Sequence, residues 1–197
     1  MHQTYDKKGV ERDDCTANII HPPIHSYQEN TLPSIQAAID LGADIVEIDI
    51  HPTIDGEIIV FHDWTLPCRT DGSGVTQDQT SDYLKSLDIG YGYTADNGKT
   101  YPFRGQFVGA MPTLGEVLTA FPETSLFVNI QAKACLKQYL LYRFERRLKK
   151  VGSKAMLMGS YTVGEQAHPG IDDNESIPEK FGGIAWTNRI DVLGSEN

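Results

Sequence analysis

The stretch from Asp44 to Asp63 constrains the fold of this chain more than any other part of it. Apolar residues alternate with other residues from Ile45 to His51, which is the two-residue period of a β-strand with one buried face. In such a strand Glu47 and Asp49 point to the same face, about 7 Å apart along the chain. Carboxylate oxygens at about 2.3–2.6 Å are the ligands that Ca²⁺ prefers. The pair therefore predicts a site for one divalent cation.

A second apolar run follows a strong turn signal. Ile58 to Phe61 has the composition of a short strand and ends at His62, and Asp55-Gly56 lies between the two runs as a typical hairpin turn. If these two residues form the turn, Asp49 lies directly opposite His62 on the same face. An acidic pair beside an imidazole suits metal-assisted hydrolysis, with His62 as proton donor or acceptor. The alternative is a solvated acidic sheet face with a structural histidine at the strand end.

The run from Glu29 to Thr76 resembles the amino-terminal half of the glycerophosphodiester phosphodiesterase family. It contains E-N-T, G-A-D-x-V-E-x-D, D-G and V-x-F-H-D elements in the order and spacing of that family. The resemblance implies an α/β fold, a TIM (β/α)8-type barrel, with Ca²⁺ or Mg²⁺ held by Glu47 and Asp49. It also implies that His62 is one of two acid/base histidines in the hydrolysis of a glycerophosphodiester to glycerol 3-phosphate and an alcohol.

The chain departs from the family pattern at three elements. H-R-G, which supplies the second histidine and a phosphate-binding arginine, does not occur in the sequence. His21 stands near the usual offset, but the first residues also resemble the segment that follows H-R-G in a bacterial branch, and we favour an H-R-G upstream of Met1. The third metal-binding glutamate corresponds to Gln131, a weaker ligand than a carboxylate. Lys133 in the same element is expected to contact the phosphate.

The remaining elements suggest an incomplete barrel. A complete barrel of this type typically needs about 250 residues, whereas the chain has 197, so it is expected to be one internally shortened domain over residues 1–197. Helices are expected over 32–41, 81–87, 114–121, 134–151 and 177–181, and strands over 16–20, 45–51, 58–61, 125–130, 155–158 and from residue 184.

The segment from Asp88 to Gly109 is rich in glycine and aromatic residues and has no helical period. A loop of this length in a compact domain is usually functional or disordered. It is interpreted as an aromatic lid beside the site, with Arg104 and Lys99 as contacts for an anionic substrate. The alternative is a solvated packing loop.

Composition narrows the set of partners. With 27 acidic and 17 basic residues the net charge is −10, which argues against nucleic acid. Cys15, Cys68 and Cys135 are widely spaced and are interpreted as free thiols, which favours a reducing compartment. No apolar run is long enough to span a membrane, and no signal peptide is recognised. The basic face of the 134–151 helix is either a solvated barrel exterior or a weak contact for anionic lipid.

Three functions are therefore considered. The first is a metal-dependent phosphodiesterase that acts on a small glycerophosphodiester. The second is a catalytically impaired relative that only binds a cation or a phosphodiester. The third is a related phospholipase-type diesterase that shares the barrel.

Overall fold

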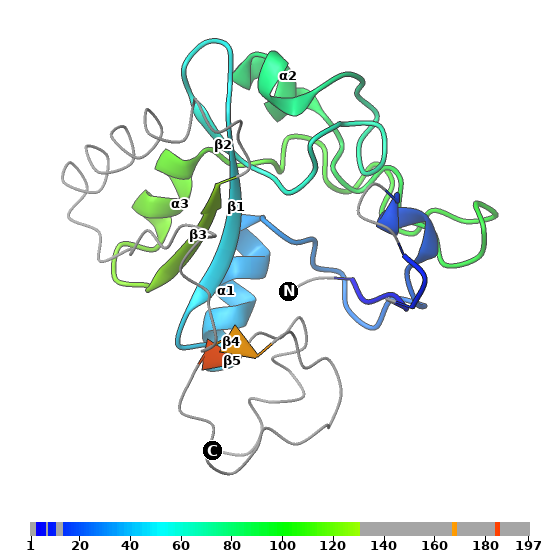
Figure 1. Cartoon of the computed structure of the whole chain (residues 1–197), viewed down its shortest axis with the longest axis horizontal. Helices are drawn as coiled ribbons and strands as arrows, with labels where there is room; N and C mark the ends of the chain where they lie inside the picture. Colours follow the sequence, from blue (N-terminus) through cyan, green and yellow to red (C-terminus); the bar gives the residue numbers. More distant parts are fainter. Residues whose placement is uncertain (1–2, 7, 11–13, 131–166, 169–183, 186–197) are drawn as a thin grey trace.

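The computed structural model describes residues 3–6, 8–10, 14–130, 167–168 and 184–185 (Figure 1). Its centre is a three-stranded sheet in the order β2-β1-β3. The strands are β1 (Val46–Pro52), β2 (Ile58–Val60) and β3 (Leu126–Ile130). β1 runs antiparallel to β2 and parallel to β3. The strands predicted over 45–51, 58–61 and 125–130 are therefore present, each within one residue of its expected bounds.

Helices α1 (Leu32–Asp40) and α3 (Leu114–Ala120) cover one face of this sheet (Figure 1). Both begin where the sequence predicts, because Thr31 and Thr113 each form a capping box with the residue three positions on. Their apolar faces meet the sheet in one buried cluster. It includes Ile35, Ala38, Val46, Ile48, Ile50, Leu114, Val117, Leu118, Leu126 and Val128. Parallel strands with helices on one face are the repeating unit of a β/α barrel.

The β1–β2 hairpin differs from the predicted register by one residue. Ile50 pairs with Val60, and the Phe61 amide donates to the Asp49 carbonyl at 3.0 Å, so Phe61 rather than His62 lies opposite Asp49. The turn causes the shift. It contains three residues rather than two: the Thr53 amide donates to the Glu57 carbonyl at 3.1 Å, and Gly56 has a φ of +80°.

The segment between β2 and α3 packs against Ile59, whose side chain belongs to a different buried cluster from those of Ile58 and Val60. The segment includes α2 (Ser81–Ser86) and the 3₁₀ turn η2 (Thr76–Asp78). The buried side chains of this cluster are Ile59, Phe61, Leu66, Leu84, Leu87, Ile89 and Met111. Residues 88–109 form neither helix nor strand, as predicted, apart from one isolated bridge between Asp88 and Val108.

Two predictions for the amino-terminal region are wrong. Residues Thr16–Ile19 form a 3₁₀ helix, η1, rather than a strand, and the bridge from Tyr5 to Ile20 is isolated. Cys15 and Cys68 are not free thiols: they form a disulfide, with their α-carbons 5.3 Å apart. The pairing joins residues 53 positions apart in the sequence, so their spacing alone does not reveal it.

The carboxy-terminal part of the chain is described at two short strands only. β4 (Ala167–His168) and β5 (Ile184–Ala185) pair in parallel. The strand expected from residue 184 is thus present, whereas no strand was expected at Ala167–His168. The elements predicted over 134–151, 155–158 and 177–181 lie outside the described residues. Within the described ranges no helix combines the length and the apolar character that a membrane span requires.

Candidate active site

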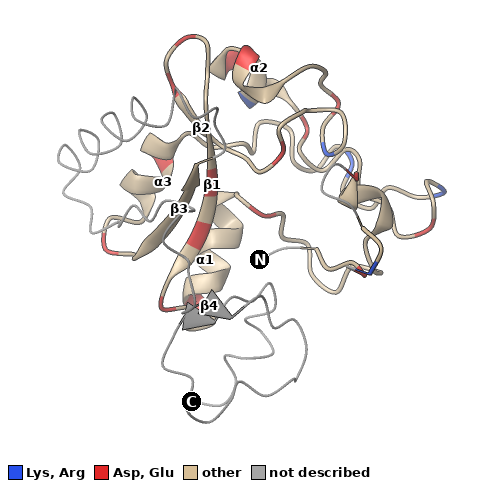
Figure 2. Ribbon diagram, viewed as in Figure 1, with Lys and Arg blue, Asp and Glu red and all other residues tan. Residues whose placement is uncertain are grey.

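The face of β1 that points away from α1 and α3 carries the acidic pair. Glu47 and Asp49 alternate with the core residues of the strand, as predicted, and Figure 2 shows the acidic positions along β1. Asp49 is buried and its two carboxylate oxygens accept from different amides, Asn30 Nδ2 at 3.1 Å and Asn129 Nδ2 at 3.0 Å. The Asp49 amide donates to Asn30 Oδ1 at 3.0 Å. This carboxylate is therefore fixed by two neutral side chains.

Asn30 owes its place to an unusual backbone conformation. Its φ of +60° lies in the left-handed region, which asparagine enters more readily than most residues. This turn directs its side chain to Asp49 just before α1 begins at Leu32. Asn129 reaches the same carboxylate because β3 pairs with β1 at that position.

Glu47 lies in an environment that disfavours its charge. Burial, and next the adjacent Asp49 carboxylate, raise the pKa of Glu47 to about 8. Two close carboxylates of this kind are the oxygen donors that a divalent cation prefers. The residues present therefore fit such an ion. Among the described residues no group of three or more His, Cys, Asp or Glu side chains is arranged to hold a metal, and Gln131, the predicted third ligand, lies outside them.

His62 follows β2 and is half exposed, with 52% of its side chain accessible. Its Nδ1 lies 2.7 Å from Asp63 Oδ1. This hydrogen bond raises the pKa of His62 to about 9, with Asp49 acting in the same direction and burial and the Arg69 charge opposing it. The imidazole is therefore protonated at neutral pH. Nδ1 is hydrogen-bonded to Asp63, whereas Nε2 takes no part in that bond.

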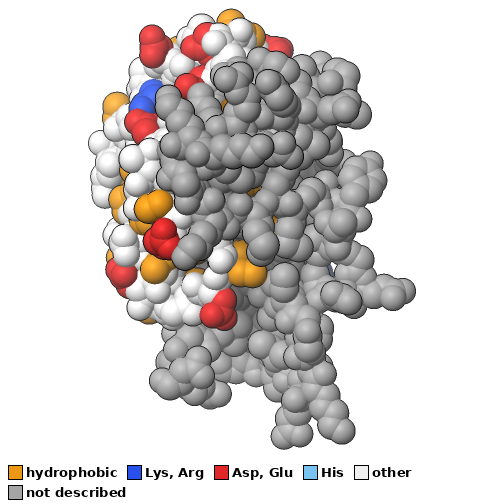
Figure 3. All heavy atoms as spheres, turned by 90° about the vertical axis from the view of Figure 1, so that its left-hand side faces the viewer, with side chains coloured by type: hydrophobic (Ala, Val, Ile, Leu, Met, Phe, Trp, Pro, Cys, Tyr) orange, Lys and Arg blue, Asp and Glu red, His pale blue; other side chains and the backbone are white. Residues whose placement is uncertain are grey.

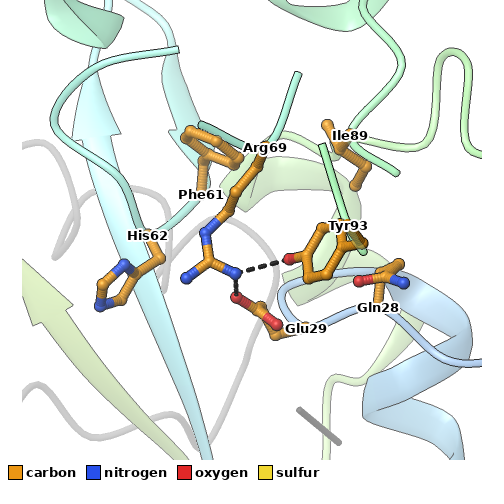
Figure 4. Close-up of a pocket in the computed structure, with 7 residues that line it drawn as sticks. All are labelled: Gln28, Glu29, Phe61, His62, Arg69, Ile89 and Tyr93. Atoms are coloured by element: carbon orange, nitrogen blue, oxygen red, sulfur yellow. Dashed lines mark hydrogen bonds and ion pairs between the residues drawn. The ribbon is translucent and has the colours of Figure 1, made fainter. Parts of the chain in front are cut away.

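Arg69 forms the centre of an ion-pair network next to His62 (Figure 4). Its side chain is 4% exposed and its Nε lies 2.9 Å from Asp63 Oδ1. Nη1 donates to Glu29 Oε1 and to the Tyr93 hydroxyl, the latter at 2.5 Å, and Nη2 donates to Thr16 Oγ1 at 3.0 Å. One guanidinium thus holds groups from four separate segments of the chain.

A pocket with about 210 Å³ of atom-free space, part of it open to solvent, lies beside this network. Figure 4 shows its wall, which consists of Gln28, Glu29, Phe61, His62, Arg69, Ile89 and Tyr93. Two of these residues come from the 88–109 loop. The loop therefore contributes to the pocket wall, while its Tyr93 and Phe103 also pack in a buried cluster with an edge-to-face ring contact.

His51 is a second histidine on the acidic side of β1, and it is fully buried. Its Nε2 lies 3.3 Å from the His62 carbonyl oxygen. Burial lowers the pKa of His51 to about 4, so the ring is neutral at pH 7. A neutral buried ring in this position anchors the backbone of His62 rather than exchanging protons with solvent.

The predicted substrate contacts are not brought together with this pocket. Arg104 is exposed and lies between the rings of Tyr91 and Tyr101, with its guanidinium carbon 3.9 and 3.6 Å from their centroids. It is not among the residues that line the pocket, and neither is Lys99. Lys133 lies outside the described residues.

On the face shown in Figure 3 the described acidic and hydrophobic side chains are interspersed.

Sequence reasoning missed Asn30, Asn129, Asp63 and Arg69. Asp63 stands next to His62, and the H-D pair is a local signal for an imidazole–carboxylate contact. Arg69 carries no such signal, because it lies in a turn-rich segment without periodicity and its ion partner Glu29 is 40 residues away.

The sequence model of the Glycerophosphoryl diester phosphodiesterase family matches residues 23–165. A Glycerophosphodiester phosphodiesterase from Caldanaerobacter subterraneus subsp. tengcongensis is 35% identical over 112 residues, which is 56% of this chain and 42% of that protein. A human Lysophospholipase D is 28% identical over 162 residues, covering 78% of this chain and 47% of that protein.

A solved structure shows the same fold. The Oleispira antarctica phosphodiesterase, determined in complex with the product sn-glycerol-3-phosphate, aligns with a TM-score of 0.53 and 27% identity. The alignment covers 66% of this chain and 51% of that one. The chain thus spans about half the length of the proteins it matches.

Proposed function

The chain belongs to the glycerophosphoryl diester phosphodiesterase family, and we propose from this that it carries part of the active site of a metal-dependent hydrolase. The reaction is the cleavage of a glycerophosphodiester to glycerol 3-phosphate and an alcohol. The observation that carries the proposal is the placement of two carboxylates, Glu47 and Asp49, on one face of β1, where both act electrostatically on the His62 imidazole. The family match over most of the chain also supports interpreting residues 1–197 as one domain of an incomplete barrel.

Glu47 and Asp49 are the proposed cation ligands, with Gln131 as the third. A Ca²⁺ or Mg²⁺ ion bound there supplies charge neutralisation at the phosphate and lowers the pKa of an attacking hydroxyl. The amides of Asn30 and Asn129 keep the Asp49 oxygens in place. Without a bound cation, Glu47 holds a proton up to about pH 8.

His62 is the proposed general acid. Asp63 accepts from Nδ1, which leaves the proton on Nε2 to be given to the oxygen of the departing alcohol. Its raised pKa keeps the imidazole protonated at neutral pH, and its half-exposed position lets a substrate reach it. Lys133 and Arg104 remain the proposed contacts for the anionic diester.

The test is the release of glycerol 3-phosphate from glycerophosphocholine, measured with and without Ca²⁺ or Mg²⁺. Release that depends on the cation and falls by about 10²–10⁴ in His62→Ala supports the proposal, since proton transfer by a positioned side chain contributes this much. Absence of release at every cation concentration rejects hydrolysis by this chain. Lysophosphatidylcholine, included as a second substrate, tests the phospholipase-type alternative that the similarity to a human Lysophospholipase D favours.

A second candidate is a family member that binds the cation or the diester without turnover. A neutral Gln131 in place of the third glutamate of the resembling motif favours it. This candidate predicts Ca²⁺ binding that depends on Glu47 and Asp49 with no glycerol 3-phosphate released. A chain that neither binds Ca²⁺ through Glu47 and Asp49 nor releases glycerol 3-phosphate rejects both candidates.

A further inference from the structure

We infer that Arg69 is a positioning residue for the acid/base histidine: it fixes Asp63, and through Asp63 it fixes the ring orientation and the tautomer of His62. The inference rests on the proposed function for its catalytic consequence. Its structural part, the control of one imidazole by a guanidinium, stands on the contacts of the network itself.

Asp63 Oδ1 is shared between two partners. It lies 2.7 Å from His62 Nδ1 and 2.9 Å from Arg69 Nε. His62 is half exposed and lies two residues beyond the end of β2, so packing alone does not hold its ring. Asp63 is 16% exposed at its side chain and is the group that connects this ring to the buried interior.

Arg69 is anchored at every other point. Nη1 donates to Glu29 and Tyr93, Nη2 donates to Thr16, and the side chain is almost fully buried. The planar fork of a guanidinium can hold two carboxylates in fixed directions, which a lysine ammonium cannot do. The backbone on either side is also fixed: Cys68 is in the disulfide, and the Gly92 amide donates to the Arg69 carbonyl at 3.3 Å.

The charges around Arg69 favour positioning over phosphate binding. Two carboxylates, Glu29 and Asp63, flank one guanidinium, so the cluster carries an excess negative charge before His62 is counted. An anionic diester gains little attraction from a cation that is already compensated in this way. The role of Arg69 is therefore exerted through Asp63.

The Arg69 charge also favours the ionised form of Asp63. Burial opposes ionisation, but the hydrogen bond from His62 and the charge of Arg69 together lower the pKa of Asp63. The groups with charge or titration that act on His62 are Asp63, Asp49, Arg69, Glu47 and His51. Of these, Asp63 is the one that contacts its ring.

The test is ¹⁵N NMR of the His62 ring in the full chain, recorded without substrate at a pH above 9, where the ring is neutral. In the wild type the proton should reside on Nδ1, facing Asp63. In Arg69→Gln the ratio should move about fivefold toward the Nε2–H form, which is the net contribution of one ordinary hydrogen bond. Tyr93→Phe removes one acceptor of Arg69 without changing charge and should move the ratio in the same direction by less.

The control is Lys85→Gln, which removes the cation of the exposed Lys85–Glu116 ion pair and should leave the ratio unchanged. Should Arg69→Gln fail to fold, Tyr93→Phe decides the question alone. An unchanged ratio in every folded variant of the network, or an equal change in the control, overturns the inference. Because the NMR measurement needs no turnover, a chain that releases no glycerol 3-phosphate would defeat the proposed function without deciding the role of Arg69. Where turnover is observed, Arg69→Gln should lower kcat and leave KM unchanged.

Discussion

The acidic pair on β1 and the network around Arg69 use the same residue types to opposite effect. Asp49 accepts from two asparagine amides, and the pKa of the adjacent Glu47 is raised. Asp63 meets a guanidinium and an imidazole, and its pKa is lowered. The difference lies in the partners, because both regions are largely buried. The first region sets two carboxylates among neutral amides and suits a cation, whereas the second contains its own buried cation, Arg69.

Removal of the disulfide should have the largest effect on stability, because it links the segment before Thr16 to the one that carries Arg69. The Cys15→Ser, Cys68→Ser double variant should lose about 4 kcal/mol of unfolding free energy, the value expected for a closed loop of this length. Urea denaturation measures this loss. A reductant should lower the stability of the wild type to that of the double variant and leave the variant unaffected. Equal stability of both proteins in oxidising buffer would contradict the pairing.

Glu29→Gln should destabilise the ion-pair network around Arg69. The change replaces a charged acceptor of Arg69 with a neutral one and leaves the ion pair with Asp63, so it should cost about 2 kcal/mol, the scale of one hydrogen bond between charged groups. Thermal or urea unfolding at pH 8 in the presence of EDTA provides the measurement. A cost no larger than that of Lys85→Gln, which opens an exposed pair, would show that burial does not set the strength of this network.

Glu47→Gln under the same conditions should act in the opposite direction. The folded-state pKa of Glu47 is raised above 4.5, so its contribution to stability is present below that pH and is lost as the pH rises through about 8. The neutral variant avoids this loss and should be about 2 kcal/mol more stable than the wild type at pH 8 without a cation. Saturating Ca²⁺ should reverse the order. A destabilised variant in EDTA would refute the conclusion that burial disfavours the charge of Glu47.

The smallest effect is expected for the pH dependence of His62. Its pKa is raised, so the stability it gains from Asp63 is present below about pH 6.5 and is lost as the pH rises through about 9. As a general acid it should also sustain turnover up to about pH 9 and lose it above. Asp63→Asn should move this alkaline limit toward the ordinary histidine value of about 6.5. An unmoved limit would show that another group controls it.

Local patterns predicted the frame of the molecule well. The alternation in β1 and the helical periods of α1 and α3 each depend on residues within a few positions of one another. The same locality explains why Glu47 and Asp49 were recognised as a pair. The predicted hairpin register was wrong by one residue because Asp55-Gly56 suits a two-residue turn. The hydrogen bond from Thr53 to Glu57 instead encloses a turn of three residues.

Contacts between distant segments account for what the sequence did not predict. Asn129 reaches Asp49 across 80 positions and Arg69 reaches Glu29 across 40. Neither contact has a periodic or compositional signature, since it depends on strand pairing and on where a loop folds back. The disulfide between Cys15 and Cys68 was missed for the same reason. Lys133 and Gln131 stay predictions, because they lie outside the described residues.

Calorimetric titration of the full chain with Ca²⁺ at pH 7.5 tests the central claim most directly, since it asks whether the acidic pair on β1 accepts a cation. One binding event should appear in the wild type and in Asp82→Asn, which removes an exposed carboxylate of α2, and its affinity should fall at least about tenfold in Glu47→Gln and in Asp49→Asn. Absence of binding at millimolar Ca²⁺, or equal affinity in all four proteins, would contradict the account.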